Sequence, residues 1–155
     1  MTMKQQKQAG FLLAKIHQLG GRVFARLLKK HGVDQINPAQ GRIMFALWQQ
    51  DGIPINDLAQ RTKLGKSTLT SMLDRLETSG LVKRVPSKED RRKILIQRTD
   101  ADKALESLYV RVSQEMHTVW YKGFTEPRIE QFEADLQQIL DNLSDLEKGT
   151  SYDRT

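Results

Sequence analysis

The chain has 155 residues, with 25 Lys or Arg against 19 Asp or Glu and a formal net charge of +6. It has no cysteine, which excludes disulfides, thiolate metal ligands and cysteine-based redox sensing. No apolar run approaches the roughly twenty residues that span a bilayer, and the N-terminus is polar rather than a signal peptide. We therefore expect a soluble cytoplasmic protein without membrane association, built as one domain or as one domain with an appended helical element.

The charge is unevenly distributed along the chain. Residues 1–98 hold 19 Lys or Arg and 7 Asp or Glu, a net charge of +12, whereas residues 99–155 hold 6 and 12, a net charge of −6. A surface that binds a polyanion needs clustered cations that displace condensed counterions, and only the first part of the chain supplies them. A basic membrane-surface protein would place its cations opposite a large apolar face on one helix, and no segment of that kind stands out.

Two helices are predicted before residue 53. The first is long, and Gly20 and Gly21 interrupt its apolar stripe, which consists of Leu12, Ile16, Leu19, Val23 and Leu27. Each glycine costs a helix about 1 kcal/mol relative to Ala, so the pair predicts a kink or a close backbone contact with another helix. The second helix begins at an Asn37 cap followed by Pro38 and ends before Asp51–Gly52. Its apolar face consists of Ile43, Met44, Leu47 and Trp48.

The segment from Ile53 to Ile96 has the order helix, short turn, amphipathic helix and two strands joined by a charged loop, which is a winged helix-turn-helix. The amphipathic helix begins after Gly65 and closes at Ser79–Gly80. Its buried stripe consists of Leu69, Met72, Leu73 and Leu76. Its other face carries short hydroxyls and cations, which suit base edges and phosphates in a major groove. These residues are Lys66, Ser67, Thr68, Thr70, Ser71 and Arg75.

The loop that follows is strongly cationic, since six of the eleven residues from Lys83 to Lys93 are Lys or Arg. Pro86 to Asp90 makes the turn between the strands. A solvated surface turn is the alternative interpretation, because charge runs are often only exposed to water. The position directly after a candidate recognition helix favours DNA binding instead. The candidate DNA-binding residues of this wing are Lys88, Asp90, Arg91 and Arg92.

Two further helices are predicted after the wing, one reaching about Gly123 and one opening at Thr125–Glu126–Pro127. The apolar residues of the second alternate steps of three and four, as in a coiled-coil seam. They are Ile129, Phe132, Leu136, Ile139, Leu143 and Leu146. We expect the N- and C-terminal helices to pair with those of a second subunit. The alternative is that both only cap their own core.

Three segments of the sequence are the most specific for a family. They are INPAQ (36–40), DLAQRTKLGKSTLTSMLDRLETSGLVKR (57–84) and the wing motif DRR (90–92) followed by KILI. In these segments the chain resembles the MarR family of bacterial transcriptional regulators. The resemblance covers nearly the whole chain. It implies an obligate dimer joined by the first and the last two helices, with the recognition helix in the major groove and a wing arginine in the minor groove. Carried over to this chain, it implies that Ser67, Thr68, Thr70, Ser71 and Arg75 face DNA. Arg92 is then the wing arginine, and Asp90 holds the wing in shape.

Three residues depart from the family pattern. Lys63 stands where the turn usually has Gly, Arg98 where the second wing strand usually ends in Leu, and Asp102 where Gly is common. None belongs to the DNA-facing set, so the expected fold stands. The junction between the wing and the following helix is the place where a local difference is expected.

The resemblance also implies a small organic effector, often aromatic and anionic, bound between the dimerisation helices and the winged-helix body. The candidate effector residues are His17, Arg22, Phe45 and Trp48. Core packing explains Phe45 and Trp48 at least as well. The expected dimer interface comprises Leu12, Ile16, Leu19, Ile129, Phe132, Leu136, Ile139 and Leu143.

An enzyme is the least favoured class. Residues 65–67 read GKS, the end of a phosphate-binding loop, but the full pattern requires Gly at position 60, which is Gln60, and a strand before the loop rather than a helix. The three histidines, His17, His31 and His117, are scattered without metal-ligand or catalytic spacing, so each is interpreted as a packed or surface residue. We expect no catalytic residue, no metal and no cofactor.

The sequence thus predicts a mainly α protein with a small β-hairpin wing. Residues 36–99 are assigned to the winged helix-turn-helix domain, 1–35 and 100–148 to a helical dimerisation region, and 149–155 to a polar tail. The predicted function is a transcriptional regulator, a repressor, that binds a palindromic operator in double-stranded DNA as a homodimer and is released by a small organic effector. The alternative is a winged helix that binds protein without specific DNA binding.

Overall fold

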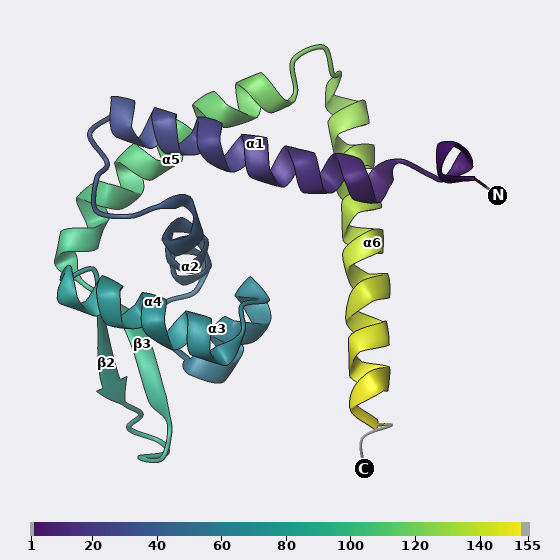
Figure 1. Ribbon diagram of the computed structural model, residues 1–155. Coiled ribbons are helices and arrows are strands. Elements are labelled where there is room, and N and C mark those ends of the chain that lie inside the picture. The colour runs from purple at the N-terminus through teal and green to yellow at the C-terminus, as the bar shows by residue number, and fades with distance from the viewer. Residues whose placement is uncertain (1, 153–155) are drawn as a thin grey trace. The chain divides into compact units, whose positions relative to one another are not determined.

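The computed structural model describes residues 2–152, which form two compact units, one ending at Met116 and the other beginning at His117 (Figure 1). A short 3-10 helix, η1 (Met3–Gln5), precedes the helices α1 (Ala9–Lys30), α2 (Pro38–Gln49), α3 (Ile55–Thr62), α4 (Lys66–Thr78), α5 (Asp100–Trp120) and α6 (Glu126–Tyr152). The strands are β1 (Ile53–Pro54), β2 (Val82–Pro86) and β3 (Ile94–Arg98). The winged helix-turn-helix fold class is therefore confirmed. None of the described helices meets the length and hydropathy needed to cross a membrane.

The sheet has three strands in the order β1-β3-β2, all antiparallel, where the sequence predicted only the two wing strands. The unpredicted strand is β1, in which Ile53 pairs with Ile96 and Pro54 with Leu95. A two-residue strand that contains proline has no alternating pattern of its own. It exists because β3, which is more than forty residues away in sequence, offers it a partner.

The ends of α2 and α4 follow the local signals in the sequence. Asn37 Oδ1 accepts a hydrogen bond from Gln40 N at 2.8 Å, and Gln40 Oε1 accepts one from Asn37 N at 3.0 Å, which forms a capping box at the start of α2. Helix α4 starts after Gly65 and ends at Thr78. Gly80 then adopts a φ of +78°, and Leu81 N donates to Leu76 O, as in a Schellman motif.

Lys63, one of the three departures from the family pattern, lies in the turn between α3 and α4. It is the only non-glycine residue among residues 2–152 with a positive φ, +55°. This left-handed conformation is the one that glycine adopts without steric cost. The turn therefore keeps its backbone geometry although the usual glycine is absent.

One core joins α2, the helix-turn-helix and the sheet in the first unit. Of the predicted stripe on α4, Leu69, Leu73 and Leu76 are fully buried, whereas Met72 is only partly buried. Gly41 on α2 is in close contact with Tyr109 on α5, because a Cβ added at Gly41 would lie 2.2 Å from Tyr109 Oη. Only glycine fits this crossing of α2 and α5.

Helix α1 is continuous through Gly20 and Gly21. A Cβ added at Gly21 would meet no described atom within 4 Å, so a close backbone contact of Gly21 within this chain is absent. On α2, Ile43, Met44 and Leu47 are fully buried, but Phe45 is 54% exposed. Core packing therefore does not explain Phe45, contrary to the alternative drawn from the sequence.

The second unit consists of the end of α5, a turn and α6. Thr125 Oγ1 accepts a hydrogen bond from Arg128 N at 3.4 Å, which confirms the predicted cap of α6. Tyr121, Phe124 and Phe132 form an aromatic cluster with edge-to-face geometry. Of the residues expected to form a polar tail, 149–152 continue α6, and 153–155 lie outside the described residues.

Candidate nucleic-acid interface

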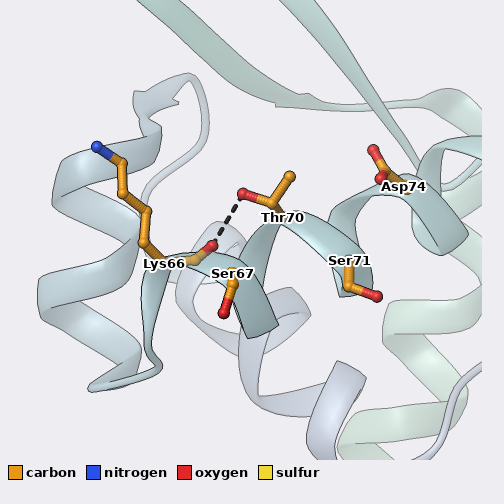
Figure 2. Close-up of a pocket in the computed structure, with 5 residues that line it drawn as sticks. All are labelled: Lys66, Ser67, Thr70, Ser71 and Asp74. Atoms are coloured by element: carbon orange, nitrogen blue, oxygen red, sulfur yellow. Dashed lines mark hydrogen bonds between the residues drawn. The ribbon is translucent and has the colours of Figure 1, made fainter.

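The exposed face of α4 carries a shallow hollow lined by polar residues (Figure 2). The lining residues are Lys66, Ser67, Thr70, Ser71 and Asp74. Ser67 and Ser71, one helical turn apart, point to the same side of the helix. Four of these five residues are among the DNA-facing candidates. Thr68 and Arg75, also candidates, are exposed on the same helix outside the hollow.

Thr70 contributes to this surface in a restricted way. Its Oγ1 donates to the backbone oxygen of Lys66 at 2.8 Å, one turn earlier in α4. The hydroxyl hydrogen is therefore used inside the helix, which leaves oxygen lone pairs and a methyl group for an incoming ligand. An acceptor of this kind suits the exocyclic amines of adenine or cytosine, and the methyl group suits that of thymine.

Asp74 is a residue of this surface that the sequence interpretation missed. It follows Thr70 and Ser71 at a spacing of four and three, which was the available signal. Its Oδ1 accepts a hydrogen bond from Arg84 Nη2 at 2.7 Å. The guanidinium offsets the charge of a carboxylate on a surface that is otherwise suited to phosphates.

Arg84 also joins β2 to α4. Its Nη1 donates to Glu77 Oε1 at 3.0 Å and its backbone N donates to Glu77 Oε2 at 3.1 Å, in addition to the bond with Asp74. Arg84 was counted among the six cations of the wing, but its guanidinium is paired with two carboxylates of α4. One of the six cations thus holds the wing strand against the recognition helix and is not directed to solvent.

The wing loop between β2 and β3 is closed by a compact set of bonds. Ser87 N donates to Lys93 O, and Lys93 N donates to Asp90 O, each at 2.9 Å. Asp90 Oδ1 accepts from Arg92 N at 3.0 Å and lies 3.4 Å from Arg92 Nε. The side chain of Arg92 is nevertheless 93% exposed. Asp90 therefore shapes the tip through the backbone and leaves most of the Arg92 side chain accessible.

The remaining wing cations are also accessible. Lys88, Arg91 and Lys93 are exposed, and the structure gives none of their side chains a hydrogen bond or an ion pair. The α4 face and the wing tip belong to the same compact unit, and both carry exposed polar or cationic side chains. Lys or Arg side chains with free donors are what phosphate contacts require.

The structure does not bring the four effector candidates into direct contact. His17, Arg22 and Phe45 are exposed, and Trp48 is partly buried. No hydrogen bond, ion pair or ring contact among the described residues joins His17 or Arg22 to either aromatic ring. Trp48 instead packs against Tyr109, with ring centroids 4.9 Å apart. The effector assignment therefore stays a prediction.

Tyr109 is a buried residue of this region that the sequence interpretation missed. Its ring contacts Phe24 of α1 at 5.3 Å and Trp48 of α2, both edge to face. Burial raises the pKa of the phenol to about 12, and the positive charge of Arg42 opposes this effect. Tyr109 therefore stays protonated at physiological pH and joins α1, α2 and α5 through one aromatic cluster.

The candidate dimer residues differ in exposure. Leu12, Ile16 and Leu19 on α1 are between 38% and 57% exposed, and on α6 Ile139 is 40% and Leu143 61% exposed. Ile129, Phe132 and Leu136 are partly buried, and Phe132 packs within its own chain against Tyr121 and Phe124. Apolar side chains exposed along one helix commonly mark interaction sites.

The described residues contain no group of three or more His, Asp or Glu that is placed to hold a metal ion. His31, at the end of α1, pairs with Glu115 of α5, with Nε2 and Oε2 2.7 Å apart. Lys30 Nζ lies 3.3 Å from the other oxygen of Glu115. Glu115 thus joins the end of α1 to α5.

Comparisons with known proteins agree with this geometry. Residues 36–94 match the model of the MarR family. The chain is 30% identical over 126 residues to TtmR, an HTH-type transcriptional regulator from Methylorubrum extorquens, a match that covers 81% of this chain and 58% of TtmR. It is 26% identical over 136 residues to IacR, an HTH-type transcriptional repressor from Pseudomonas putida, with 88% and 80% covered.

Among solved structures, the chain is similar to a mutant MarR from E. coli complexed with operator DNA. The TM-score is 0.75 at 27% identity, and the match covers 84% of this chain and 92% of that one. The chain thus spans less than two thirds of the length of TtmR, but most of IacR and of the operator-bound protein.

Proposed function

Because this chain belongs to the MarR family, we propose that it is a sequence-specific DNA-binding transcriptional regulator that acts as a repressor. It binds a palindromic operator as a homodimer, with α4 in the major groove and the wing in the minor groove. The observation that carries this proposal is the hydroxyl- and cation-bearing face of α4. Arg84, on strand β2 of the cationic wing, is hydrogen-bonded to Asp74 and Glu77 of this helix.

The two parts of this surface are suited to different tasks. Ser67, Thr70 and Ser71 offer short acceptors and donors that reach base edges, where a major groove distinguishes all four base pairs. Arg92 is an exposed guanidinium at the wing tip, and a narrow minor groove attracts such a group through its enhanced negative potential. Two-fold symmetry would place two copies of this surface about one helical turn of DNA apart.

Release by a small organic effector is the second part of the proposal. With no cysteine in the chain, thiol oxidation is not available as an input. A reversible ligand between the dimerisation helices and the winged-helix body is the route that the family resemblance favours. Its proposed contacts are His17, Arg22, Phe45 and Trp48.

A salt titration separates DNA binding from the alternative of a protein-binding winged helix. The equilibrium affinity for a random duplex is measured at several salt concentrations. For a DNA-binding protein we expect log affinity to fall steeply with log salt, because each phosphate contact releases counterions. Binding that is weak and insensitive to salt would favour the protein-binding alternative. Selection of duplexes from a random pool then tests sequence preference and supplies the operator.

A further inference from the structure

The residues Arg98 and Asp102, two of the departures from the family pattern, contact each other where β3 meets α5. Asp102 is fully buried. Trp48 Nε1 donates to both of its carboxylate oxygens, at 2.9 and 3.0 Å, and Arg98 Nε donates to Oδ2. Arg98 Nη2 in turn donates to Glu106. The positive charge of Arg98 thus offsets the negative charge of the buried Asp102, and Trp48 supplies a further hydrogen bond to the carboxylate.

Stability alone is a weak explanation for this arrangement. Burial of a carboxylate carries a large desolvation cost, and the ion pair with its hydrogen bonds often does no more than offset that cost. An apolar pair of similar volume would do as well or better. What the ionic group adds is geometry. The buried carboxylate must stay bonded to two N–H groups, that of Trp48, which is shared between its two oxygens, and that of Arg98 Nε, and it so restricts the positions of the elements that supply them.

The bonds of this group lead in two directions within the first unit. On one side, Trp48 contacts Tyr109, and Tyr109 contacts Phe24, so the aromatic cluster of α1, α2 and α5 is reached directly. On the other side, Arg98 N donates to Asp51 Oδ1 at 2.8 Å. The next residue, Thr99, donates through Oγ1 to Gly80 O at 2.6 Å, two residues after the last residue of the recognition helix α4.

We propose that Arg98 and Asp102 are positioning residues that couple the aromatic cluster of Phe24, Trp48 and Tyr109 to the recognition helix α4. A displacement of Trp48 changes two of the bonds that hold the Asp102 carboxylate. Asp102 then moves Arg98 and the neighbouring Thr99, which is bonded to Gly80 just after the end of α4. By thermodynamic reciprocity, DNA bound to α4 must also change the surroundings of Trp48. This inference rests on the proposed DNA-binding function.

The test compares Trp48→Phe in two backgrounds, the unaltered chain and the double variant Arg98→Leu/Asp102→Ala, which removes the ion pair. Trp48→Phe removes the N–H donor and keeps an aromatic ring. Affinities are measured for the operator selected by the unaltered protein and for a scrambled duplex. In the unaltered background we expect Trp48→Phe to lower operator affinity about fivefold or more, the usual lower range of such coupling, with little change on the scrambled duplex. In the pairless background we expect it to change neither affinity.

A second measurement uses Trp48 as the reporter. In a Trp120→Phe background, Trp48 is the only tryptophan, since the chain has two. Operator binding is expected to change its fluorescence when Arg98 and Asp102 are present and not when they are absent. Arg98→Lys repeats both measurements with the positive charge retained, in case the pairless variant does not fold. Circular dichroism and thermal unfolding establish folding for each protein.

The outcomes separate the two proposals. Equal losses from Trp48→Phe in both backgrounds, or an equal fluorescence change in both, would show that the pair is only structural. If the unaltered protein selects no duplex over scrambled DNA, the proposed function itself is wrong. The coupling is supported if Trp48→Phe lowers the preference for the operator over the scrambled duplex only in chains that contain Arg98 and Asp102.

Discussion

Arg92 illustrates how a single side chain is prepared for its proposed partner. Asp90 accepts its backbone N–H and lies beside its Nε, which restrains the tip, while the side chain stays 93% exposed. An ion pair between exposed groups contributes little to stability. The guanidinium is therefore available for a phosphate-lined groove at little cost.

Arg92→Ala should weaken binding to operator and to scrambled DNA alike, and should reduce the salt dependence by about one unit per subunit. Sequence preference in the major groove should change little, because the proposed wing contact is with the minor groove, whose donor and acceptor pattern distinguishes few base pairs. Affinity measured at a series of salt concentrations gives the slope. Lys122→Ala removes one exposed cation outside the wing and should leave the slope unchanged. An unchanged slope for Arg92→Ala would exclude the wing tip from the DNA contact.

Lys63 is expected to be a source of backbone strain. Its φ of +55° brings Cβ close to the backbone, a cost that glycine avoids. Lys63→Gly should therefore raise the free energy of unfolding by up to about 1 kcal/mol, which the added freedom of the unfolded chain partly offsets. Urea unfolding measures the change. Lys63→Ala keeps the Cβ and serves as the control, and an equal gain for both variants would contradict the explanation.

Among the secondary-structure elements, α4 has two faces with separate tasks. Its polar face lines the open hollow, whereas Leu69, Leu73 and Leu76 have no exposed surface. The two faces should respond differently to substitution. Changes on one should affect DNA sequence preference, and changes on the other should affect folding.

Thr70→Ala and Ser71→Ala should relax sequence preference at defined operator positions by roughly 1–3 kcal/mol, with non-specific affinity nearly intact. Leu73→Ala is the control from the buried face, and it should cost about 2–5 kcal/mol of folding stability without selective loss of DNA affinity. Binding to operator and to scrambled duplex, together with urea unfolding, distinguishes the two effects. Equal losses on both duplexes for the polar variants would mean that this face does not contact bases.

We expect Glu115 to make the stability of the contact between the end of α1 and α5 dependent on pH. Its hydrogen bond with His31, and then that with Lys30, hold the pKa of this carboxyl below its usual value. The folded state therefore favours the charged form. The resulting stability is present above the ordinary pKa of a glutamate and is lost as the pH falls through the lowered one.

The melting temperatures of the unaltered chain and of Glu115→Gln, measured across pH, test this. The unaltered chain should melt higher at neutral pH, and the difference should vanish in acid. Glu126→Gln removes an exposed carboxylate at the start of α6 and is the control. A difference that persisted below the lowered pKa would contradict the assignment.

The complete protein, as proposed, is a dimer, and its exposed apolar side chains favour this. On α6, Ile139, Leu140, Leu143 and Leu146 are between 40% and 68% exposed, and on α1 Phe11 is 64% exposed. Isolated exposed apolar residues are common, but a regular series along one helix is typical of an interface.

Replacing Leu136 and Leu143 by Asp should convert the dimer to a monomer and lower operator affinity at the same time, because like charges would be buried across the interface. Sedimentation at micromolar concentration and operator binding measure the two effects. Gln138→Asp with Asn142→Asp adds the same charge at polar positions of α6 and should stay dimeric. A monomeric unaltered chain at that concentration would refute the dimer.

The helix boundaries and the α4 faces were predictable because they depend on local interactions. Each of these features involves residues within a few positions of one another. They are the Asn37–Gln40 capping box, the end of α4 at Gly80 and the three- and four-residue spacing of the leucines. Exposed hydroxyls and cations on the opposite face follow from the same periodicity. The family resemblance then assigned the role of wing arginine to Arg92, which stays a prediction.

The remaining features depend on residues far apart in the chain. The strand β1 exists only because it pairs with β3, and the exposure of Phe45 depends on which face of α2 the rest of the core covers. The sequence interpretation counted Arg84 among the wing cations, but in the folded chain its guanidinium is paired with Asp74 and Glu77. In the sequence, Arg98 and Asp102 are two separate departures from the family pattern. Only the tertiary fold places Trp48, which lies more than fifty residues before Asp102, where its N–H donates to the buried carboxylate. Local sequence patterns do not predict such pairings. The hydrogen-bond partners of a buried charge are residues that only the folded chain places next to it.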